Sequence, residues 1–213
     1  MNEPRNSDLR LVGGHPALDL VNTVAPRGTG THREYLATPD DLLAWARRAS
    51  VLDEVDAAAV ARAWTDPDAA AQALDATIDI REATYTALRT RLDGDAAGAA
   101  PALARLTRRW AAATARSDLM PDPGDIAARL VVGTAPATLV ADRLADAAVD
   151  LLRTVDLRRL RVCPLAEGGC GWLFLDRSRN GSRRWCAMAD CGTHAKARRL
   201  TAKRRARRAT VGG

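Results

Sequence analysis

The sequence predicts a mainly α fold with a small β element (α+β), in which a helical N-terminal domain precedes a small cysteine-containing unit. Aromatic residues make up only 4% of the 213 residues, while alanine and leucine are abundant, which favours packed helices over a β-sandwich. A hydrophobic fraction of 47% is sufficient for a folded core. All four cysteines lie in the last third of the chain. We therefore expect two domains, over residues 1–157 and 158–213.

The helices of the first domain are indicated by their start signals. Thr38-Pro39-Asp40-Asp41 forms a helix N-terminus, because a hydroxyl can cap free backbone N–H groups, proline suits the first turn and aspartates complement the helix dipole. Asp66-Pro67-Asp68 repeats this signal before a long helix that reaches Leu92. Pro101 opens another helix, and residues 140–155 have the apolar spacing of a last one.

Two segments of this domain carry weaker signals. Residues 18–22 lie in an apolar run interrupted by glycine and proline, and their periodicity fits a helical turn or a strand. Residues 126–132 follow a turn rich in proline and glycine and are predicted to be a short strand, as half of a hairpin. The domain is thus expected to be mainly helical with one small β element.

Charge divides the chain near the same place. Residues 151–213 contain sixteen Lys or Arg and four Asp or Glu, a net charge of +12, whereas the preceding residues carry −6. Such an asymmetry points to a polyanionic partner for the C-terminal part. No apolar segment is long enough for a membrane helix, and the polar N-terminus shows no secretion signal. We therefore expect a cytoplasmic protein that does not bind membranes.

The four cysteines, Cys163, Cys170, Cys186 and Cys191, form two close pairs separated by fifteen residues. In an intracellular chain this clustering favours a tetrahedral Zn²⁺ site over disulfides. Glycine follows the second cysteine of each pair, and we expect it to turn the backbone so that amides point at the sulfur. Residues 172–175 and 183–185 are predicted to be the strands of a hairpin, and a helix is predicted to start at the last cysteine. This order describes a treble-clef-like zinc finger.

Four cysteines fill a structural zinc site and leave no open coordination position. The alternatives are two disulfides, unrelated thiols, a catalytic cysteine, or His194 as a ligand in place of one cysteine. No histidine–acid set accompanies the cysteines, which argues against the catalytic alternative.

Residues 170–197, CGWLFLDRSRNGSRRWCAMADCGTHAKA, closely resemble the CGNR zinc finger. In that family the last cysteine opens a Cys-Gly-Asn-Arg tetrad, which here is Cys191-Gly192-Thr193-His194, so the asparagine and the arginine are both replaced. Residues 13–23 and 38–45 resemble the ABATE domain, which usually precedes this finger. Together the resemblances imply a bacterial, stress-linked transcription regulator.

The sequence after Thr193 is helix-permissive and strongly basic, with no acidic residue after Asp190. A polyanion, DNA in the first place, is therefore the expected partner. RNA is the nearest alternative, because Trp172, Phe174 and Trp185 could stack on bases, although in so small a unit these rings are expected to form its core. The predicted DNA-binding residues are Arg177, Arg179, Asn180, Arg183, Arg184, His194, Lys196, Arg198, Arg199, Lys203, Arg204 and Arg205.

His15, Asp19, Asn22 and Thr23 are polar residues within the apolar run near the N-terminus. They are candidates for a pocket that binds a small-molecule effector; alternatively, Asp19 and Asn22 hydrogen-bond nearby backbone and hold the glycine-rich entry to the domain. No phosphate-binding glycine loop, nucleophile elbow or two-histidine metal motif is present, so we expect a protein that is not an enzyme.

These observations predict a zinc-dependent DNA-binding transcription regulator whose N-terminal domain senses an effector or mediates dimerisation. One small finger contacts a limited stretch of DNA, which favours a homodimer. The alternatives are an RNA- or ribosome-associated binding module and an enzyme with a pocket in the N-terminal domain.

Overall fold

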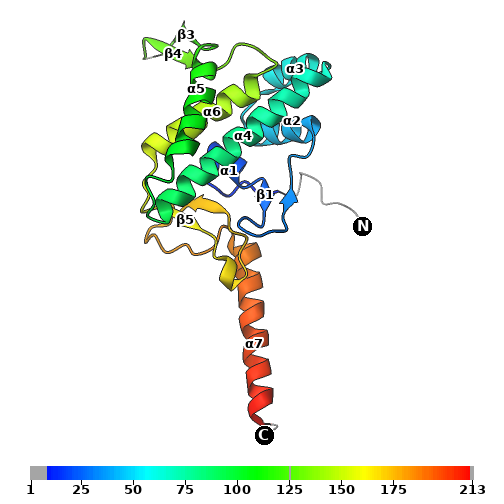
Figure 1. Ribbon diagram of the computed structural model, residues 1–213, viewed down its shortest axis with the longest axis vertical. Helices are drawn as coiled ribbons and strands as arrows, with labels where there is room; N and C mark the ends of the chain where they lie inside the picture. The colour runs from blue at the N-terminus through cyan, green and yellow to red at the C-terminus, as the bar shows by residue number, and fades with distance from the viewer. Residues whose placement is uncertain (1–8, 125, 212–213) are drawn as a thin grey trace.

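The computed structural model describes residues 9–124 and 126–211, and the side chains of the last helix as far as residue 202. Its long axis runs from a β-hairpin at one end, through a helical body and a small finger, to a single helix that projects from the other end (Figure 1). Within the described residues, no helix is long and apolar enough to cross a membrane. The prediction of a mainly α fold with a small β element is confirmed.

Four helices form the centre of the body. The longest, α4, packs against both α5 and α6, and those two also pack against each other. The short helix α1 contacts α4 and α6, while α2 and α3 cover one end. The helices are α1 (Pro16–Val21), α2 (Pro39–Arg48), α3 (Glu54–Ala63), α4 (Pro67–Leu92), α5 (Ala100–Thr114), α6 (Leu139–Thr154) and α7 (Thr193–Val211), with single turns η2 (Leu165–Glu167) and η3 (Met188–Gly192) in the finger.

Local side-chain caps explain where several helices begin. At the start of α2, Thr38 and Asp41 form a reciprocal capping box, with each side chain accepting the backbone N–H of the other residue at 3.0 to 3.1 Å. Asp66 caps α4 by accepting the N–H of Asp68 at 3.0 Å. The helix starts predicted from these sequences are confirmed, and residues 18–22, whose periodicity was ambiguous, lie in α1 and at its end.

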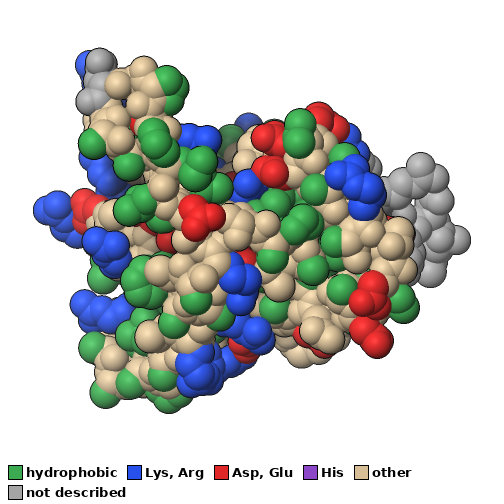
Figure 2. All heavy atoms as spheres, turned by 90° about the horizontal axis from the view of Figure 1, so that it is seen from above, with side chains coloured by type: hydrophobic (Ala, Val, Ile, Leu, Met, Phe, Trp, Pro, Cys, Tyr) green, Lys and Arg blue, Asp and Glu red, His purple; other side chains and the backbone are tan. Residues whose placement is uncertain are grey.

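The strands form three separate antiparallel pairs. The hairpin of β3 and β4, which contains the strand predicted within residues 126–132, stands away from the body, and both of its strands are solvent-exposed except at residue 131. Figure 2 shows hydrophobic side chains on the surface at this end of the molecule. The pairs are β1 (Val24–Ala25) with β2 (Arg33–Glu34), β3 (Asp118–Pro121) with β4 (Ala128–Val131), and β5 (Leu160–Val162) with β6 (Leu173–Leu175).

The finger differs from the sequence prediction in its strand pairing. Residues 173–175 form a strand as expected, but they pair with β5, which lies before the first cysteine, and residues 183–185 do not form a strand. The reason is visible at Arg183. Its backbone N–H donates to the Asp176 carboxylate at 2.9 Å, and its guanidinium donates to the carbonyl of Trp185 at 3.0 Å, so side-chain bonds replace a strand ladder.

One continuous hydrophobic core joins the helical body to the finger. It contains Leu18, Leu88 and Leu144 from the helices together with Leu160 and Phe174 from the finger, all at most 2% exposed. The finger is therefore packed onto the body rather than connected only by a linker.

Candidate metal centre and nucleic-acid interface

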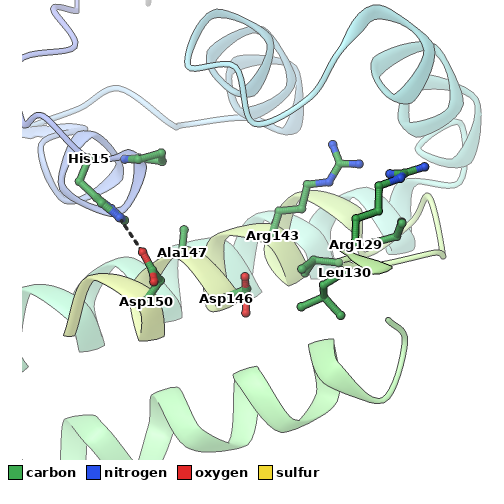
Figure 3. A pocket seen from close by; sticks show the side chains of 10 residues that line it. His15, Arg129, Leu130, Arg143, Asp146, Ala147 and Asp150 are labelled. Carbon is green, nitrogen blue, oxygen red and sulfur yellow. Dashed lines mark hydrogen bonds and ion pairs between the residues drawn. The ribbon is translucent and has the colours of Figure 1, made fainter. Parts of the chain in front are cut away.

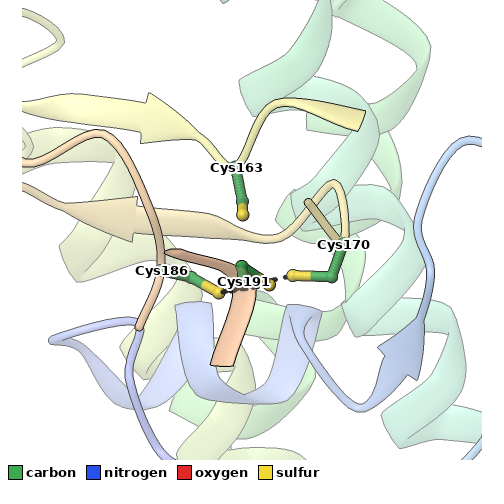
Figure 4. Close-up of side chains that lie close together, drawn as sticks. All are labelled: Cys163, Cys170, Cys186 and Cys191. Atoms are coloured by element: carbon green, nitrogen blue, oxygen red, sulfur yellow. Dashed lines mark hydrogen bonds between the residues drawn. The ribbon is translucent and has the colours of Figure 1, made fainter. Parts of the chain in front are cut away.

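The four cysteine thiols converge at one point in the finger. Cys163 directly follows β5 and Cys170 lies shortly before β6, so the β5–β6 hairpin carries the first pair at its turn. Cys186 comes from the loop that follows, and Cys191 from the turn η3 at the base of α7. Their four sulfur atoms lie within 4.8 Å of one another, and Figure 4 shows them pointing toward a common centre.

This geometry fits tetrahedral zinc. A Zn–S bond of about 2.3 Å implies sulfur atoms about 3.8 Å apart in a regular tetrahedron. The Sγ atoms of Cys170 and Cys186 are 3.4 Å apart, those of Cys186 and Cys191 are 3.7 Å apart, and none of the four cysteines forms a disulfide. All four ligand positions are filled by thiols, so the zinc is structural.

The thiols alone do not share one protonation state. Hydrogen bonds from the other three thiols lower the pKa of Cys163, whereas hydrogen bonding to Cys163 raises the pKa of Cys170. Through the hydrogen bonds between thiols the pKa of Cys186 is also raised and that of Cys191 is lowered, so the four thiols do not all favour the thiolate form. A bound divalent cation removes this conflict, because it favours the thiolate form of every ligand.

The hairpin turn that holds the first two cysteines depends on close backbone approach. The N–H of Cys163 donates to Trp172 O at 2.8 Å, and the N–H of Gly171 donates to Cys163 O at 3.1 Å. Gly171 has a φ of +74°, and a Cβ at this residue would lie 2.3 Å from the carbonyl oxygen of Arg27. The expectation that Gly171 turns the backbone is confirmed, but its amide binds a carbonyl rather than a sulfur. The Gly192 amide likewise donates to Ala187 O.

The loop between the cysteine pairs is organised around a buried carboxylate. Asp176 is fully buried and accepts the hydroxyl of Ser178 at 2.5 Å, and also the backbone N–H groups of Ser178 and Arg183 at 2.9 Å. These bonds, the Ser178 hydroxyl first, lower the pKa of Asp176. The guanidinium of Arg183 then stacks over Phe174 at 4.6 Å and donates to the carbonyl of Cys186. Asp176 and Arg183 therefore fix the approach of the chain to the third ligand.

The N-terminal segment of the body supplies a second support for the metal centre. The side-chain amide of Asn22 donates to Leu173 O at 2.8 Å and accepts the Leu173 N–H at 3.0 Å. The Trp172 indole donates to Val24 O at 2.7 Å, and the Arg27 N–H donates to the carbonyl of the ligand Cys170 at 2.8 Å. We call residues 13–27, with the finger residues that they contact, the seam.

The four polar residues predicted as a candidate pocket are not brought together in one cavity. Asn22 lies in the seam, Thr23 donates to Leu20 O at 2.8 Å, and Asp19 accepts the Gly13 N–H at 2.8 Å, with burial raising its pKa. His15 caps α1 and also lines a cavity next to α6. Local backbone hydrogen bonding, the alternative drawn from the sequence for Asp19 and Asn22, describes Asp19, whereas Asn22 binds the backbone of the distant Leu173.

The predicted DNA-binding residues fall into three groups. Exposed and without a hydrogen-bond or ion-pair partner among the described residues are Arg179, Asn180, His194, Lys196 and Arg198. Arg184 and Arg199 both form ion pairs with Glu167, while Arg183 and Arg177 donate to backbone carbonyls of the finger and the N-terminal segment. Lys203, Arg204 and Arg205 lie outside the residues whose side chains are described.

Family models match the chain in two consecutive segments. Residues 14–155 match the ABATE family, described as "Putative stress-induced transcription regulator", and residues 159–204 match the CGNR zinc finger. The chain belongs to the ABATE family. The match to the finger covers all four cysteines, so donor chemistry, geometry and family agree on a structural zinc site. No individual curated protein matches this ABATE protein.

Sequence reasoning did not find the residues of the seam and of the finger loop that support the metal centre. Arg27 and Asp176 were not candidates, and Asn22 was a candidate only for a different role. Their partners are distant in sequence, as for Asn22 and Leu173, which are 151 residues apart. A possible signal was the buried position expected for a polar side chain between Leu20, Val21 and Val24, because a buried polar group requires a hydrogen-bond partner.

Proposed function

We propose that this ABATE protein is a transcription regulator that binds DNA through the zinc finger and α7. One observation carries the proposal: the fourth cysteine of a closed zinc site lies in the turn from which a basic helix projects into solvent (Figure 1). Zinc fixes the direction in which this helix leaves the body. Without zinc the turn η3, against which α7 packs, would lose its link to the other three ligands.

The shape and charge of α7 suit a nucleic-acid groove. Its 19 residues span about 28 Å at 1.5 Å per residue, and an α-helix fits the major groove of B-DNA. It contains eight Lys or Arg and no acidic residue. Ala195 is buried in its first turn, whereas Lys196 to Thr201 are all exposed. The first turn of α7 therefore packs against the finger, and the residues after it are exposed and accessible to a nucleic acid.

The charge pattern makes α7 unfavourable in isolation and favourable on a polyanion. Basic residues recur at i,i+4 spacing, for example at positions 199 and 203, and like charges at this spacing destabilise a helix. Phosphates would relieve that repulsion while counterions are released. We assign phosphate contacts to Lys196, Arg198 and Arg199, with the same role for Lys203, Arg204 and Arg205.

The loop before α7 supplies the remaining contacts. Arg179, Asn180 and Arg184 are exposed on the same finger, and His194 stands at the beginning of α7. These side chains can donate to base edges or phosphates. Arg177 and Arg183 serve the seam and the loop, so we assign them a supporting role.

The aromatic rings of the finger favour DNA over single-stranded RNA. Trp172 and Trp185 are 8% exposed and Phe174 is fully buried, so these rings form the core of the finger. Stacking on unpaired bases requires exposed rings. We further propose a homodimer in the cytoplasm, since one finger offers a small footprint and specific sites are usually read by two.

The test is a selection from random duplex DNA with the zinc-loaded full-length chain, repeated after chelation. We expect an enriched sequence that is lost without zinc, and two-fold symmetry in that sequence would support the dimer. Retention of DNA without enrichment would contradict sequence-specific binding, and preference for structured RNA in competition would replace DNA as the partner.

Two double variants distinguish the contribution of the α7 surface to DNA binding from that of the total charge of the protein. Lys196→Ala with Arg198→Ala should weaken binding to every sequence and reduce the slope of log K against log salt by about one to two, measured by fluorescence anisotropy. Arg62→Ala with Arg108→Ala removes the same charge from exposed positions on α3 and α5 and should leave that slope unchanged. Equal effects of both pairs would contradict the assigned surface.

A further inference from the structure

A cavity of about 470 Å³ lies between the start of α1, strand β4 and helix α6 (Figure 3). One face of α6 lines it, because Arg143, Asp146, Ala147 and Asp150 follow the i, i+3, i+4, i+7 spacing of a helical stripe. His15 closes the opposite wall. The volume is within the range of cavities that bind small molecules.

Both signs of charge line this cavity. Figure 3 shows Arg129 and Arg143 side by side at one end, and His15 paired with Asp150 at the other. Arg129 has no hydrogen-bond or ion-pair partner among the described residues, whereas Arg143 donates to Asp56 at 2.6 Å and to Val51 O at 2.8 Å. One end therefore offers a guanidinium that is free to bind an anion.

The carboxylates of the cavity keep acceptor oxygens free. Asp146 accepts the Trp110 indole N–H through one oxygen at 3.1 Å, and Asp150 approaches His15 Nε2 through one oxygen at 3.4 Å. The Nδ1 atom of His15 accepts the Ala17 N–H at 3.2 Å, so its Nε2 carries the proton and is a donor to Asp150. The second oxygen of each carboxylate has no partner among the described residues.

Apolar residues also line the cavity. They are Leu130 and Val131 from β4, Ala147 from α6 and Pro16 from α1. The hairpin that provides β4 is mostly solvent-exposed, with Leu119 at 73% and Leu130 at 54%. Since an isolated two-stranded hairpin is marginally stable in water, a molecule held against β4 would also stabilise the hairpin.

We propose that this cavity binds a small zwitterion with an apolar frame, of the size of an apolar amino acid or its dipeptide. The carboxylate pairs with Arg129, the ammonium group lies against Asp146 and Asp150, and the apolar part covers Leu130 and Ala147. A dianion would face two carboxylates, and a simple cation would face two guanidiniums. Only a ligand with both charges can form a charge-assisted hydrogen bond at each end, and such bonds are stronger than those between neutral groups.

The cavity is connected to the finger through the start of α1. Gly13 and Gly14, which directly precede His15, accept the Leu175 N–H at 2.9 Å and the Arg177 guanidinium at 2.6 Å. A ligand that holds His15 and Pro16 therefore contacts the seam itself, next to the Gly13 and Gly14 carbonyls that bind the finger. This coupling, which rests on the proposed function, would make the zwitterion an effector of DNA binding.

The binding test uses the zinc-loaded full-length chain without DNA. Saturation-transfer NMR and calorimetry would compare L-leucine and L-leucyl-L-leucine with two analogues of leucine that carry a single charge, isocaproate and isoamylamine. We expect each analogue to bind at least about tenfold more weakly than the zwitterions. Equal affinities, or no binding by either zwitterion, would overturn the proposal.

Variants locate the site. Arg129→Ala should weaken leucine binding about tenfold, and Asp150→Asn should do the same, since both side chains are exposed and their loss leaves the core intact. The matched controls are Arg108→Ala and Asp75→Asn, which remove the same charges from exposed positions on α5 and α4. Unchanged affinity in Arg129→Ala would overturn the assignment.

A second readout tests the coupling separately. Leucine should change the affinity for the selected duplex in the wild-type chain, and Arg129→Ala should abolish that change. Leucine binding with unaltered DNA affinity would overturn the coupling but leave the binding site standing. A chain that binds no DNA would contradict the proposed function without affecting the NMR result.

Discussion

The helical body and the finger are stabilised by different means. In the body, α6 alone buries eight residues against its neighbours, and the largest buried side chains are mostly leucine. The finger has only short strands, a few buried apolar residues and four cysteines, so its core cannot hold it together without a cross-link. The seam joins the two, because Asn22 and Val24 satisfy backbone and indole groups of the finger. The bound metal therefore stabilises the finger, which the burial of its few apolar residues would not stabilise alone.

The largest expected effect breaks the finger and spares most of the body. Cys186→Ser removes one of four ligands, so zinc content should fall from one per chain to none, because structural zinc supplies about 10 kcal/mol or more in such small units. Hydrogen exchange should become fast in residues 159–195 and in the seam, while α4 and α6 remain protected. Mass spectrometry of exchanged peptides and a zinc assay would measure both effects.

His194→Ala is the matched control for this prediction. His194 is exposed and the four sulfurs already form the cluster, so this variant should keep its zinc. Loss of zinc in His194→Ala, or a Cys186→Ser chain that retains zinc and its fold, would contradict the four-cysteine assignment.

The second effect falls on the body and should leave the metal in place. Leu144 is fully buried in α6, and Leu144→Ala should lower the free energy of unfolding by about 2 to 5 kcal/mol through lost apolar contact and a cavity. Denaturant unfolding would measure the change, and zinc content should stay at one per chain. Leu103→Ala, at a position that is 41% exposed on α5, should cost much less. A zinc loss in Leu144→Ala would show that the two regions are less separable than proposed.

The third effect is at the seam and should appear in both regions. Asn22→Ala leaves the N–H and the carbonyl of Leu173 without partners in a buried environment, which should cost about 2 to 4 kcal/mol. Zinc transfer to a chelator should also become faster, because Leu173 at the start of β6 lies three residues after the ligand Cys170 and helps to position it. Asn180→Ala, at an exposed position of the finger, should change neither quantity. If the rate of zinc transfer were unaltered in Asn22→Ala, the seam would stabilise the fold without slowing the release of the metal.

The sequence could predict features that depend on local interactions. Helix starts at Thr38 and Asp66 depend on caps within three residues, and the zinc ligands depend on residue type, so both are readable locally. Strand pairing is not local. Leu160 to Val162 is a three-residue strand with little pattern, and it pairs with β6 across a turn that carries two of the cysteines. Residues 183–185, the predicted partner of β6, follow it closely in the sequence. In the structure the backbone N–H of Arg183 binds the Asp176 carboxylate instead of a strand.

The sequence predicted the net charge of the finger but not the orientation of its individual charged side chains. The sequence shows an excess of Lys and Arg in the finger, but it does not show which of them turn inward. Arg183 and Arg179 are four residues apart on the same loop, yet Arg183 donates to the Trp185 carbonyl and Arg179 is exposed. Their difference arises from Asp176 and Phe174, which fix the backbone and the stacking face of Arg183.

The smallest expected effect is an electrostatic one between two helices of the body. Asp79 on α4 accepts the Nε–H groups of Arg105 and Arg109 on α5 at 2.9 and 2.8 Å. Burial alone would raise the pKa of Asp79, but these hydrogen bonds and the two positive charges outweigh it and hold the pKa below the ordinary value of 3.8. Since both arginine side chains are 42% exposed, solvent screening should limit the contribution to about 0.5 to 1 kcal/mol.

The sign of the pH dependence follows from that direction. A carboxyl group with a lowered pKa in the folded state contributes its full stability above the unfolded value and loses it as the pH falls through the folded value. Asp79→Asn should therefore be less stable than the wild type near neutral pH, and the difference should shrink once the pH falls below about 3.8. Urea unfolding of both chains over a pH series would measure it, with Asp75→Asn as the control at an exposed position. A difference that stays constant with pH would assign the effect to packing of α4 on α5, and the body would then depend on burial alone.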